Sequence, residues 1–261
     1  MKKLILQRVV FIFVSLFLLM SCMEEGPNTH DGFAFGIVRF DMKSGENVLD
    51  INDEVNLYAS RFSFDNDGDC FFVTYLINYD DEANSFEKIE ANGFVKVSIF
   101  DKLDVNRYYL ATTIDTTNVL PGEVPLEAAF WDMNGYIRYF QNKLFMFSVL
   151  QIPTDQKMDF HMSYDIENMV TEQYGKRYYN LFLRSTILDK EGTSSKDMVV
   201  IPNAFEIRNF LMEAARKEKE SGTNLTFSIR LNYPTVIRDN GVMTWAHQDL
   251  VDAFKISDIL E

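Results

Sequence analysis

The side chains that could form a metal site or a catalytic centre are few and scattered along this sequence. The string from Asp65 to Asp69, DNDGD, places carboxylates at alternate positions, as a calcium-binding loop does. An EF-hand also needs a bidentate acid at its twelfth position, and that position is Leu76. An Asp-Gly pair between two strands is a strong hairpin signal. We therefore interpret the string as a hairpin and expect no calcium at Asp65, Asp67 and Asp69.

The remaining motifs give no support for catalysis. His30, His161 and His247 are far apart, and none belongs to an HExxH pair, so no zinc site is predicted. The sequence contains no GxSxG elbow, no P-loop and no GxGxxG. A glycosidase pair stays open as an alternative, because its two carboxylates can lie far apart in the chain. The motifs favour a protein that is not an enzyme and carries no cofactor.

Two local features indicate contact with sugars. Trp131, Tyr136 and Tyr139 cluster in the string FWDMNGYIRYF, and exposed aromatic rings near loop ends are typical of sugar-binding β-sandwiches. Core packing is the alternative explanation for these rings. Separately, the string Asp115-Thr116-Thr117 resembles a short acidic-threonine motif for O-glycosylation, with Thr116 as the modified residue.

The first residues predict export and lipidation. Lys2, Lys3 and Arg8 precede an apolar run over residues 9–20, and Ser21 precedes Cys22. This order is typical of a secretory signal peptide, here residues 1–21, and the run is shorter than the ~20 residues of a membrane-spanning helix. The string LMSC resembles a bacterial lipobox, so Cys22 is predicted to carry a diacylglyceryl group and an N-acyl chain such as palmitate. An ordinary signal peptide with a chance cysteine is the alternative.

The residues behind Cys22 bear on where the protein is displayed. Residues 22–32 form a polar tether that begins with Met23, Glu24 and Glu25. In gut-type Gram-negative anaerobes, such acidic residues resemble the signal for export to the outer face of the outer membrane. We predict an outer-membrane lipoprotein at the cell surface, with the periplasmic face as the alternative.

Composition limits the classes of molecule that the protein can bind and the disulfides that it can form. The net charge is −14, and removal of residues 1–21 takes away three cations and no acid, which leaves −17. A chain this acidic repels phosphate backbones, so nucleic acid is excluded as a partner. With Cys22 acylated, Cys70 is the one remaining thiol, so no internal disulfide is expected.

Strand-like runs dominate the rest of the chain and predict a mainly β fold. Runs rich in aromatic and β-branched residues, separated by turn formers, predict an OB-like small barrel over residues 33–118. The stretch 116–125 holds two prolines and a glycine, which favours a domain boundary there. Further runs predict a β-sandwich over residues 125–261. One helix is inserted over residues 204–221, with Asn203 as its N-cap and Gly222 as its stop. The expected strands are 33–40, 56–60, 69–79, 93–100, 106–114, 142–152, 157–166, 176–188 and 224–233.

This order of elements resembles the NigD-like lipoproteins. Residues 68–75, GDCFFVTY, resemble the strand entry of that family's first domain, with Cys70 in place of the usual arginine. Residues 94–99 resemble its next barrel strand, and residues 142–149 resemble the first strand of its sandwich. Residues 177–187 and 224–233 resemble later sandwich strands. The resemblance implies a non-enzymatic, membrane-anchored binding or interaction module. The alternatives are a glycan-binding accessory lipoprotein of a polysaccharide-uptake system and a bacteriocin immunity or envelope-defence protein.

Overall fold

A computed structural model describes residues 27–52, 55–113, 116–130, 139–189, 192–222 and 225–260, apart from the side chains of residues 252 and 253. Cys22, Trp131 and Tyr136 lie outside the described residues, as does the predicted signal peptide. Within the described part of the chain, no helix is both long enough and apolar enough to cross a membrane.

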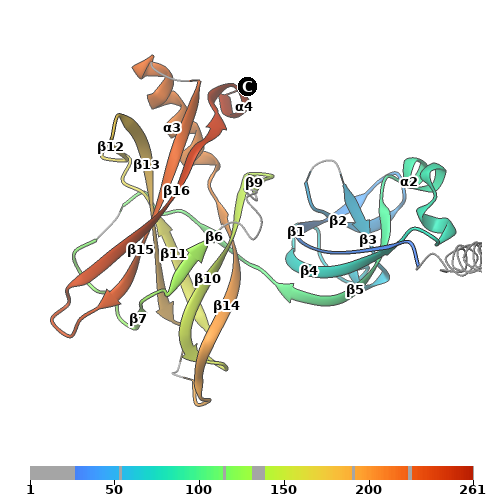
Figure 1. Ribbon diagram of the computed structural model, residues 1–261, viewed down its shortest axis with the longest axis horizontal. Coiled ribbons are helices and arrows are strands. Elements are labelled where there is room, and N and C mark those ends of the chain that lie inside the picture. The colour runs from blue at the N-terminus through green and yellow to red at the C-terminus, as the bar shows by residue number, and fades with distance from the viewer. Residues whose placement is uncertain are drawn as a thin grey trace, which may run out of the picture.

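The N-terminal domain is a closed five-stranded barrel with strand order β1-β2-β3-β5-β4 (Figure 1). Its strands are β1 (Thr29–Asp41), β2 (Glu46–Asp50), β3 (Asn56–Tyr58), β4 (Cys70–Asn78) and β5 (Val95–Asp104). The short helices η1 (Ser60–Phe62), η2 (Glu82–Asn84) and α2 (Phe86–Asn92) connect them. The barrel confirms the predicted OB-like fold of this half, and β2 is a strand that the sequence patterns did not predict.

The barrel core is small and consists mainly of aliphatic residues, with fully buried side chains from three strands and from η1. Val38, Leu49, Phe62 and Val73 are all inaccessible to solvent. Gly36 permits the close approach of β1 to β2, because a Cβ atom there would lie 2.4 Å from Cγ of Leu49. Closure pairs every strand on both sides, which leaves no free sheet edge along most of the barrel.

The C-terminal domain is a sandwich of two sheets, which we call the inner and the outer sheet. The inner sheet has strand order β6-β14-β10-β8, and β9 also pairs with β10. The outer sheet has strand order β11-β13-β15-β16, and β12 and β7 also pair with β13. The inner-sheet strands are β6 (Asn106–Tyr109), β8 (Ala128–Phe130), β9 (Tyr139–Phe140), β10 (Lys143–Pro153) and β14 (Lys196–Glu206). The outer-sheet strands are β7 (Glu123–Val124), β11 (Met158–Ser163), β12 (Val170–Gln173), β13 (Lys176–Ile187), β15 (Thr226–Ile237) and β16 (Met243–Lys255).

The predicted boundary between the domains at 116–125 differs from the structure. The barrel ends at Asp104, and β6, which was assigned to the barrel domain 33–118, pairs in parallel with β14 of the inner sheet. Val105 alone separates β5 from β6, and it is buried, with its N–H donating to the carbonyl of Cys70. The sequence of β6 resembles a barrel strand because local patterns report strand type, whereas the partner is set by distant residues.

The predicted helix begins later than expected. Asn203 lies in β14, where its buried side chain donates from Nδ2 to Oγ of Ser148 at 3.1 Å, so its assignment as an N-cap is wrong. Helix α3 spans Arg208–Ser221, and Gly222 follows it in the left-handed conformation, as predicted for its stop. The buried side chains of β14 continue the apolar pattern of the helix, which is why strand and helix could not be separated by periodicity. A short helix, α4 (Ile256–Leu260), ends the described chain.

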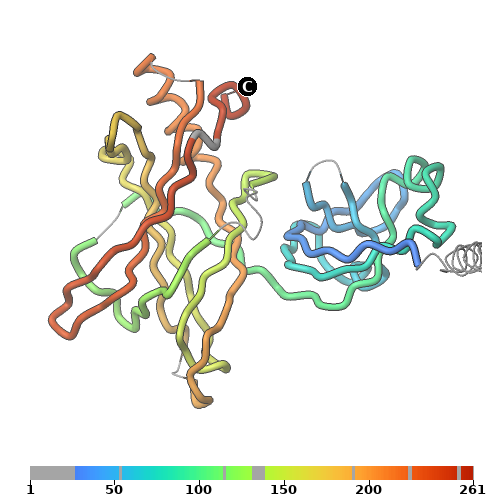
Figure 2. Tube along the Cα trace, viewed as in Figure 1, coloured from blue at the N-terminus to red at the C-terminus, as the bar shows by residue number. Residues whose placement is uncertain are grey.

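Both faces of β10 are buried over most of its length, which explains its largely apolar sequence. Leu144 and Met146 point into the sandwich core, whereas Phe145 and Phe147 point toward the barrel. The β9–β10 hairpin turns through Gln141 and Asn142, both at positive φ, which matches the right-handed twist of the two strands. The inner sheet therefore lies between the outer sheet and the barrel, as Figures 1 and 2 show.

A cluster of aromatic rings joins the two domains, and we call it the phenylalanine junction. The ring of Phe35 in the barrel lies 5.1 Å from that of Phe145 and 4.8 Å from that of Phe147. Phe72, also in the barrel, meets Phe147 edge to face at 5.1 Å. Cys70 is buried in the same cluster, and burial raises the pKa of its thiol to about 11. At its rim, Asp50 of the barrel accepts hydrogen bonds from Arg39 and from Gln141 of the sandwich.

Candidate functional site

The three aspartates considered for calcium accept hydrogen bonds from other residues of the barrel. Asp65 accepts two hydrogen bonds from Nζ of Lys102, at 2.7 and 2.8 Å. Asp67 accepts from the backbone N–H of Phe40, and Asp69 accepts from that of Asn66. These contacts order the segment between η1 and β4. In the described ranges, no group of three or more potential ligand side chains is arranged around a common metal position.

Tyr139 is the described member of the predicted aromatic cluster. It lies in β9 at the edge of the sandwich core, where its ring meets that of Phe254 edge to face at 5.5 Å. Desolvation raises the pKa of its hydroxyl to about 12. Tyr139 is partly buried, so much of its ring is already in contact with the protein.

Thr116 lines a cavity of about 480 Å³ on the face of the outer sheet that points away from the core. We call this cavity the outer-sheet pocket. Its floor is formed by residues of the outer-sheet strands β11, β13 and β16, and its wall by described residues between β6 and β7. The floor side chains are those of His161, Ser163, Phe182, Arg184 and Trp245, and the wall residues are Ala111, Thr113, Thr116 and Leu120. The cavity also touches Met162, whose side chain is buried in the sandwich core.

Alternation along β13 explains why its pocket side chains share a face. Leu181 and Leu183 are fully buried in the sandwich core, so Phe182 and Arg184 point to the opposite side. Trp245 reaches the same face from β16, where it stands opposite Pro234 of β15. The rings of Phe182 and Trp245 meet nearly at right angles, 83°, with centroids 5.7 Å apart. Together they give the pocket a partly exposed apolar surface.

A buried ion pair fixes the wall of the pocket to its floor. Nε of Arg184 donates to Oε1 of Glu123 at 2.6 Å, and Nη2 donates to the carbonyl of Asn118 at 2.6 Å. Glu123 in turn accepts from the backbone N–H of Leu120 at 2.7 Å. Solvent reaches 6 % of the Arg184 side chain and none of the Glu123 side chain. The pair removes two opposite charges together, so it leaves the pocket without net charge from these groups.

Hydrogen-bonding groups surround the aromatic pair. Nε2 of His161 lies 3.0 Å from Oγ1 of Thr186, and the imidazole remains about half exposed. Hydroxyls of Ser163, Thr113 and Thr116 also line the cavity. Ala111 bridges to Ser163, which holds the start of the wall against the edge of the sheet. The arrangement offers donors and acceptors beside a partly exposed apolar surface, the pattern of a binding site for a small polar molecule.

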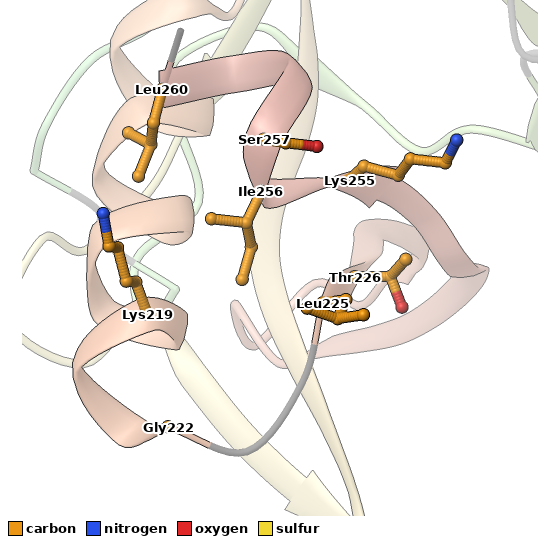
Figure 3. Close-up of a pocket in the computed structure, with 8 residues that line it drawn as sticks. All are labelled: Lys219, Gly222, Leu225, Thr226, Lys255, Ile256, Ser257 and Leu260. Atoms are coloured by element: carbon orange, nitrogen blue, oxygen red, sulfur yellow. The ribbon is translucent and has the colours of Figure 1, made fainter.

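A second cavity of about 690 Å³ lies at the end of α3, and it has a different chemical character. Its lining is apolar at Leu225, Ile256 and Leu260, and Lys219 and Lys255 lie on opposite sides of Ile256 (Figure 3). We call it the C-terminal cavity. Residues 223 and 224, which adjoin it, are outside the described residues.

Sequence patterns located part of the outer-sheet pocket but not the whole. Residue types alternate along 176–188, which places Phe182 and Arg184 on one face of the strand. Of the wall residues, Thr116 and Leu120 fall in the predicted domain boundary, and Ala111 and Thr113 fall in the predicted strand 106–114. No sequence signal placed Trp245 or His161 beside them. Those residues meet because β11, β13 and β16 belong to one sheet, an arrangement that depends on long-range pairing.

The barrel matches a known family of domains. Residues 26–103 match the family model described as the lipoprotein OB domain, which spans the barrel almost from end to end. This match confirms the resemblance to lipoproteins that begin with an OB-like domain. No curated protein matches the sequence.

Solved structures share the two-domain fold. An uncharacterized protein from Parabacteroides merdae is 19 % identical, with a TM-score of 0.66 over 85 % of this chain and 100 % of its own. The "Putative lipoprotein" of Bacteroides fragilis is 13 % identical, with a TM-score of 0.58 over 85 % of this chain and 98 % of its own. A NigD-like immunity protein from Bacteroides caccae is 12 % identical, covering 84 % of this chain and 97 % of its own. Its TM-score is 0.45.

Proposed function

We propose that this chain, whose N-terminal barrel is a lipoprotein OB domain, is a membrane-anchored lipoprotein without catalytic activity that binds a ligand through its sandwich. In this proposal Cys22 carries the lipid at the N-terminus of the mature protein. One acyl chain anchors a protein only marginally, and two or more make the attachment lasting. On the sequence evidence of Glu24 and Glu25, we propose display at the outer face of the outer membrane.

The start of β1 and the sandwich lie at opposite ends of the barrel (Figure 2), and this arrangement supports the proposal. β1 begins at Thr29, and its residues Phe35 and Ile37 belong to the phenylalanine junction. At about 3.3 Å per residue, the eight residues from Thr29 to Ile37 span roughly 26 Å. The described chain therefore enters the barrel at the end remote from the sandwich, as Figure 2 shows. Held at that end, the barrel acts as a spacer, and the outer-sheet pocket lies beyond it on the far side of the inner sheet.

The pocket chemistry supports binding over catalysis. The side chain of Glu123 is fully buried and paired with Arg184, an arrangement that keeps its carboxylate away from solvent. A general acid or base must reach the proton that it transfers. Thr116 stays the proposed site of O-glycosylation, and it is accessible enough to line the pocket.

Metabolic labelling with radioactive palmitate in a Gram-negative host tests the anchor. The parent chain should incorporate label and sediment with membranes, whereas Cys22→Ala should lose the label and become soluble. Cys70→Ala is the matched control, because it removes the other cysteine of the sequence and should keep both properties. Label retained on Cys22→Ala would contradict the anchor. Protease digestion of intact cells tests display: protection of the sandwich would assign it to the periplasmic face instead.

A further inference from the structure

The geometry of the outer-sheet pocket points to a neutral saccharide as its ligand, and we propose that the pocket binds a short, uncharged sugar unit. This inference rests on the proposed binding function and specifies the class of ligand. The volume of about 480 Å³ is within the range of pockets that take small molecules. Such pockets combine an apolar surface with a few polar groups that fix the orientation of the ligand.

The aromatic pair matches the apolar face of a sugar ring. A pyranose has C–H groups on one face and hydroxyls around its edge, so it packs flat on an aromatic ring while its hydroxyls stay hydrogen-bonded. Trp245 and Phe182 provide a partly exposed aromatic surface within the pocket. Aromatic side chains contribute a large apolar contact without requiring a charged partner. His161, Ser163 and Thr113 line the same cavity and offer donors and acceptors for the hydroxyl edge.

Electrostatics favour an uncharged sugar over an acidic one. Arg184 is the one arginine or lysine among the described lining residues, and it is paired with the buried Glu123. The whole chain carries a net charge of −14, so its field repels polyanions at a distance. The C-terminal cavity is different, because two lysines and no acid line its described part. The two cavities therefore differ in the charge of the molecules that they would accept.

A short sugar unit fits the enclosure better than a long chain does. Ala111, Thr113, Thr116 and Leu120 line one side of the pocket, and the hydrogen bond from Arg184 to the carbonyl of Asn118 holds the neighbouring chain against the floor. A long polysaccharide needs an open groove that continues past the aromatic surface. A terminal sugar or a short unit needs only one open side.

Calorimetric titration of the full chain carrying Cys22→Ala, which keeps every described residue, tests this inference. The neutral probes are maltohexaose, xylohexaose, cellohexaose, mannohexaose and chitohexaose, and the acidic probes are polygalacturonate and heparin oligosaccharides. We expect at least one neutral probe to bind and the acidic probes to bind at least about tenfold more weakly. Chromatography of the recovered probe should show it unchanged. No binding by any neutral probe, or equal binding of the acidic ones, overturns the inference.

Two variants locate the site independently. Trp245→Ala should weaken binding of that probe at least about tenfold, the loss typical of an aromatic hot spot. Thr113→Trp should weaken it similarly by filling the cavity from an exposed wall position, without altering the sheet. Phe64→Ala is the matched control, because Phe64 is a 95 % exposed aromatic residue on the barrel. Parental affinity in both pocket variants overturns the inference, yet palmitate labelling of the chain would still support the lipoprotein anchor.

Discussion

The barrel and the sandwich differ in how completely the faces of their sheets are buried. The barrel closes five strands around one aliphatic core, so its inner surface is completely used. The sandwich keeps two open sheets, each with a second face that must be covered or exposed to solvent. The inner sheet buries its second face against the barrel through Phe145 and Phe147. On the outer sheet, the described wall residues cover part of the second face, and the pocket lies between them and the sheet.

On each sheet, the side chains of the face that points away from the sandwich core suit what lies against that face. Phenylalanines on β10 make the inner sheet suited to a permanent apolar contact with another domain. On β13 the corresponding positions are Asn180, Phe182 and Arg184, which mix polar groups with one aromatic ring. A sheet face of this kind gains little from complete burial. The proposed binding surface therefore lies where aromatic rings have polar neighbours on the same sheet face.

The sandwich core should be highly sensitive to loss of a buried ring. Phe160 is 2 % exposed between the two sheets, and Phe160→Ala leaves a large cavity there. We expect the free energy of unfolding to fall by about 3–5 kcal/mol, measured by urea denaturation. Phe100→Ala, at a 65 % exposed barrel position, is the control and should change it by under about 0.5 kcal/mol. Equal effects of the two variants would contradict this assignment of the core.

The phenylalanine junction should couple the unfolding of the two domains. Phe147 contacts Phe35, Phe72 and Phe130, so Phe147→Ala removes the central ring of the junction. We expect a loss of about 2–4 kcal/mol and, in calorimetry, separation of one transition into two. A single transition in this variant would show that the domains are joined mainly by other contacts, such as the pairing of β6.

The barrel should respond most to added volume at its tightest contact. Gly36→Ala places a methyl group against Leu49, which is fully buried and cannot move aside. The expected loss is about 1–3 kcal/mol in urea denaturation, and it should affect the barrel transition of the Phe147→Ala background. Ser98→Ala, at an exposed position of β5, is the control. Parental stability of Gly36→Ala would mean that β1 and β2 approach less closely than described.

Alkaline pH should weaken the junction modestly through its buried thiol. The pKa of Cys70 is raised by burial from its ordinary value of 9.0 to about 11, so the folded state holds the proton more strongly than the unfolded state. The stability that this thiol contributes to the folded state is therefore fully present below pH 9 and is lost as the pH rises toward about 11. Urea denaturation across this range should give a steeper decline for the parent than for Cys70→Ala. Parallel declines would assign the alkaline effect to tyrosines instead.

Local sequence patterns predicted the positions of strands and helices better than they predicted which strands pair with one another. Residues 69–79 and 176–188 appear as β4 and β13 because β-branched and aromatic residues mark strands wherever these lie. The assignment of β6 to the barrel was wrong because four residues do not specify which sheet they will join. Asn203 has the character of a helix cap, yet its hydrogen bond to Ser148 completes a buried strand pair.

The candidate site was less predictable than the fold for the same reason. Phe182 and Arg184 could be assigned to one strand face from alternation alone. Trp245 follows Phe182 by 63 positions, and only the pairing of β13 with β15 and of β15 with β16 brings their rings together. Glu123 occurs in a stretch that resembles a linker, and its role depends on the buried guanidinium of Arg184.

The single buried residue between β5 and β6 has a mechanical consequence. With Val105 as the whole connection, the chain contains no slack that could absorb tension between its two domains. A pull on the tether, opposed by a ligand held in the sandwich, would reach β6 directly. Because β6 runs parallel to β14 over the pairs from Asn106–Asn203 to Tyr109–Glu206, that load would shear their hydrogen bonds together instead of opening them one at a time. With the anchor and the ligand placed as proposed, this pairing would resist a force that pulls the two domains apart.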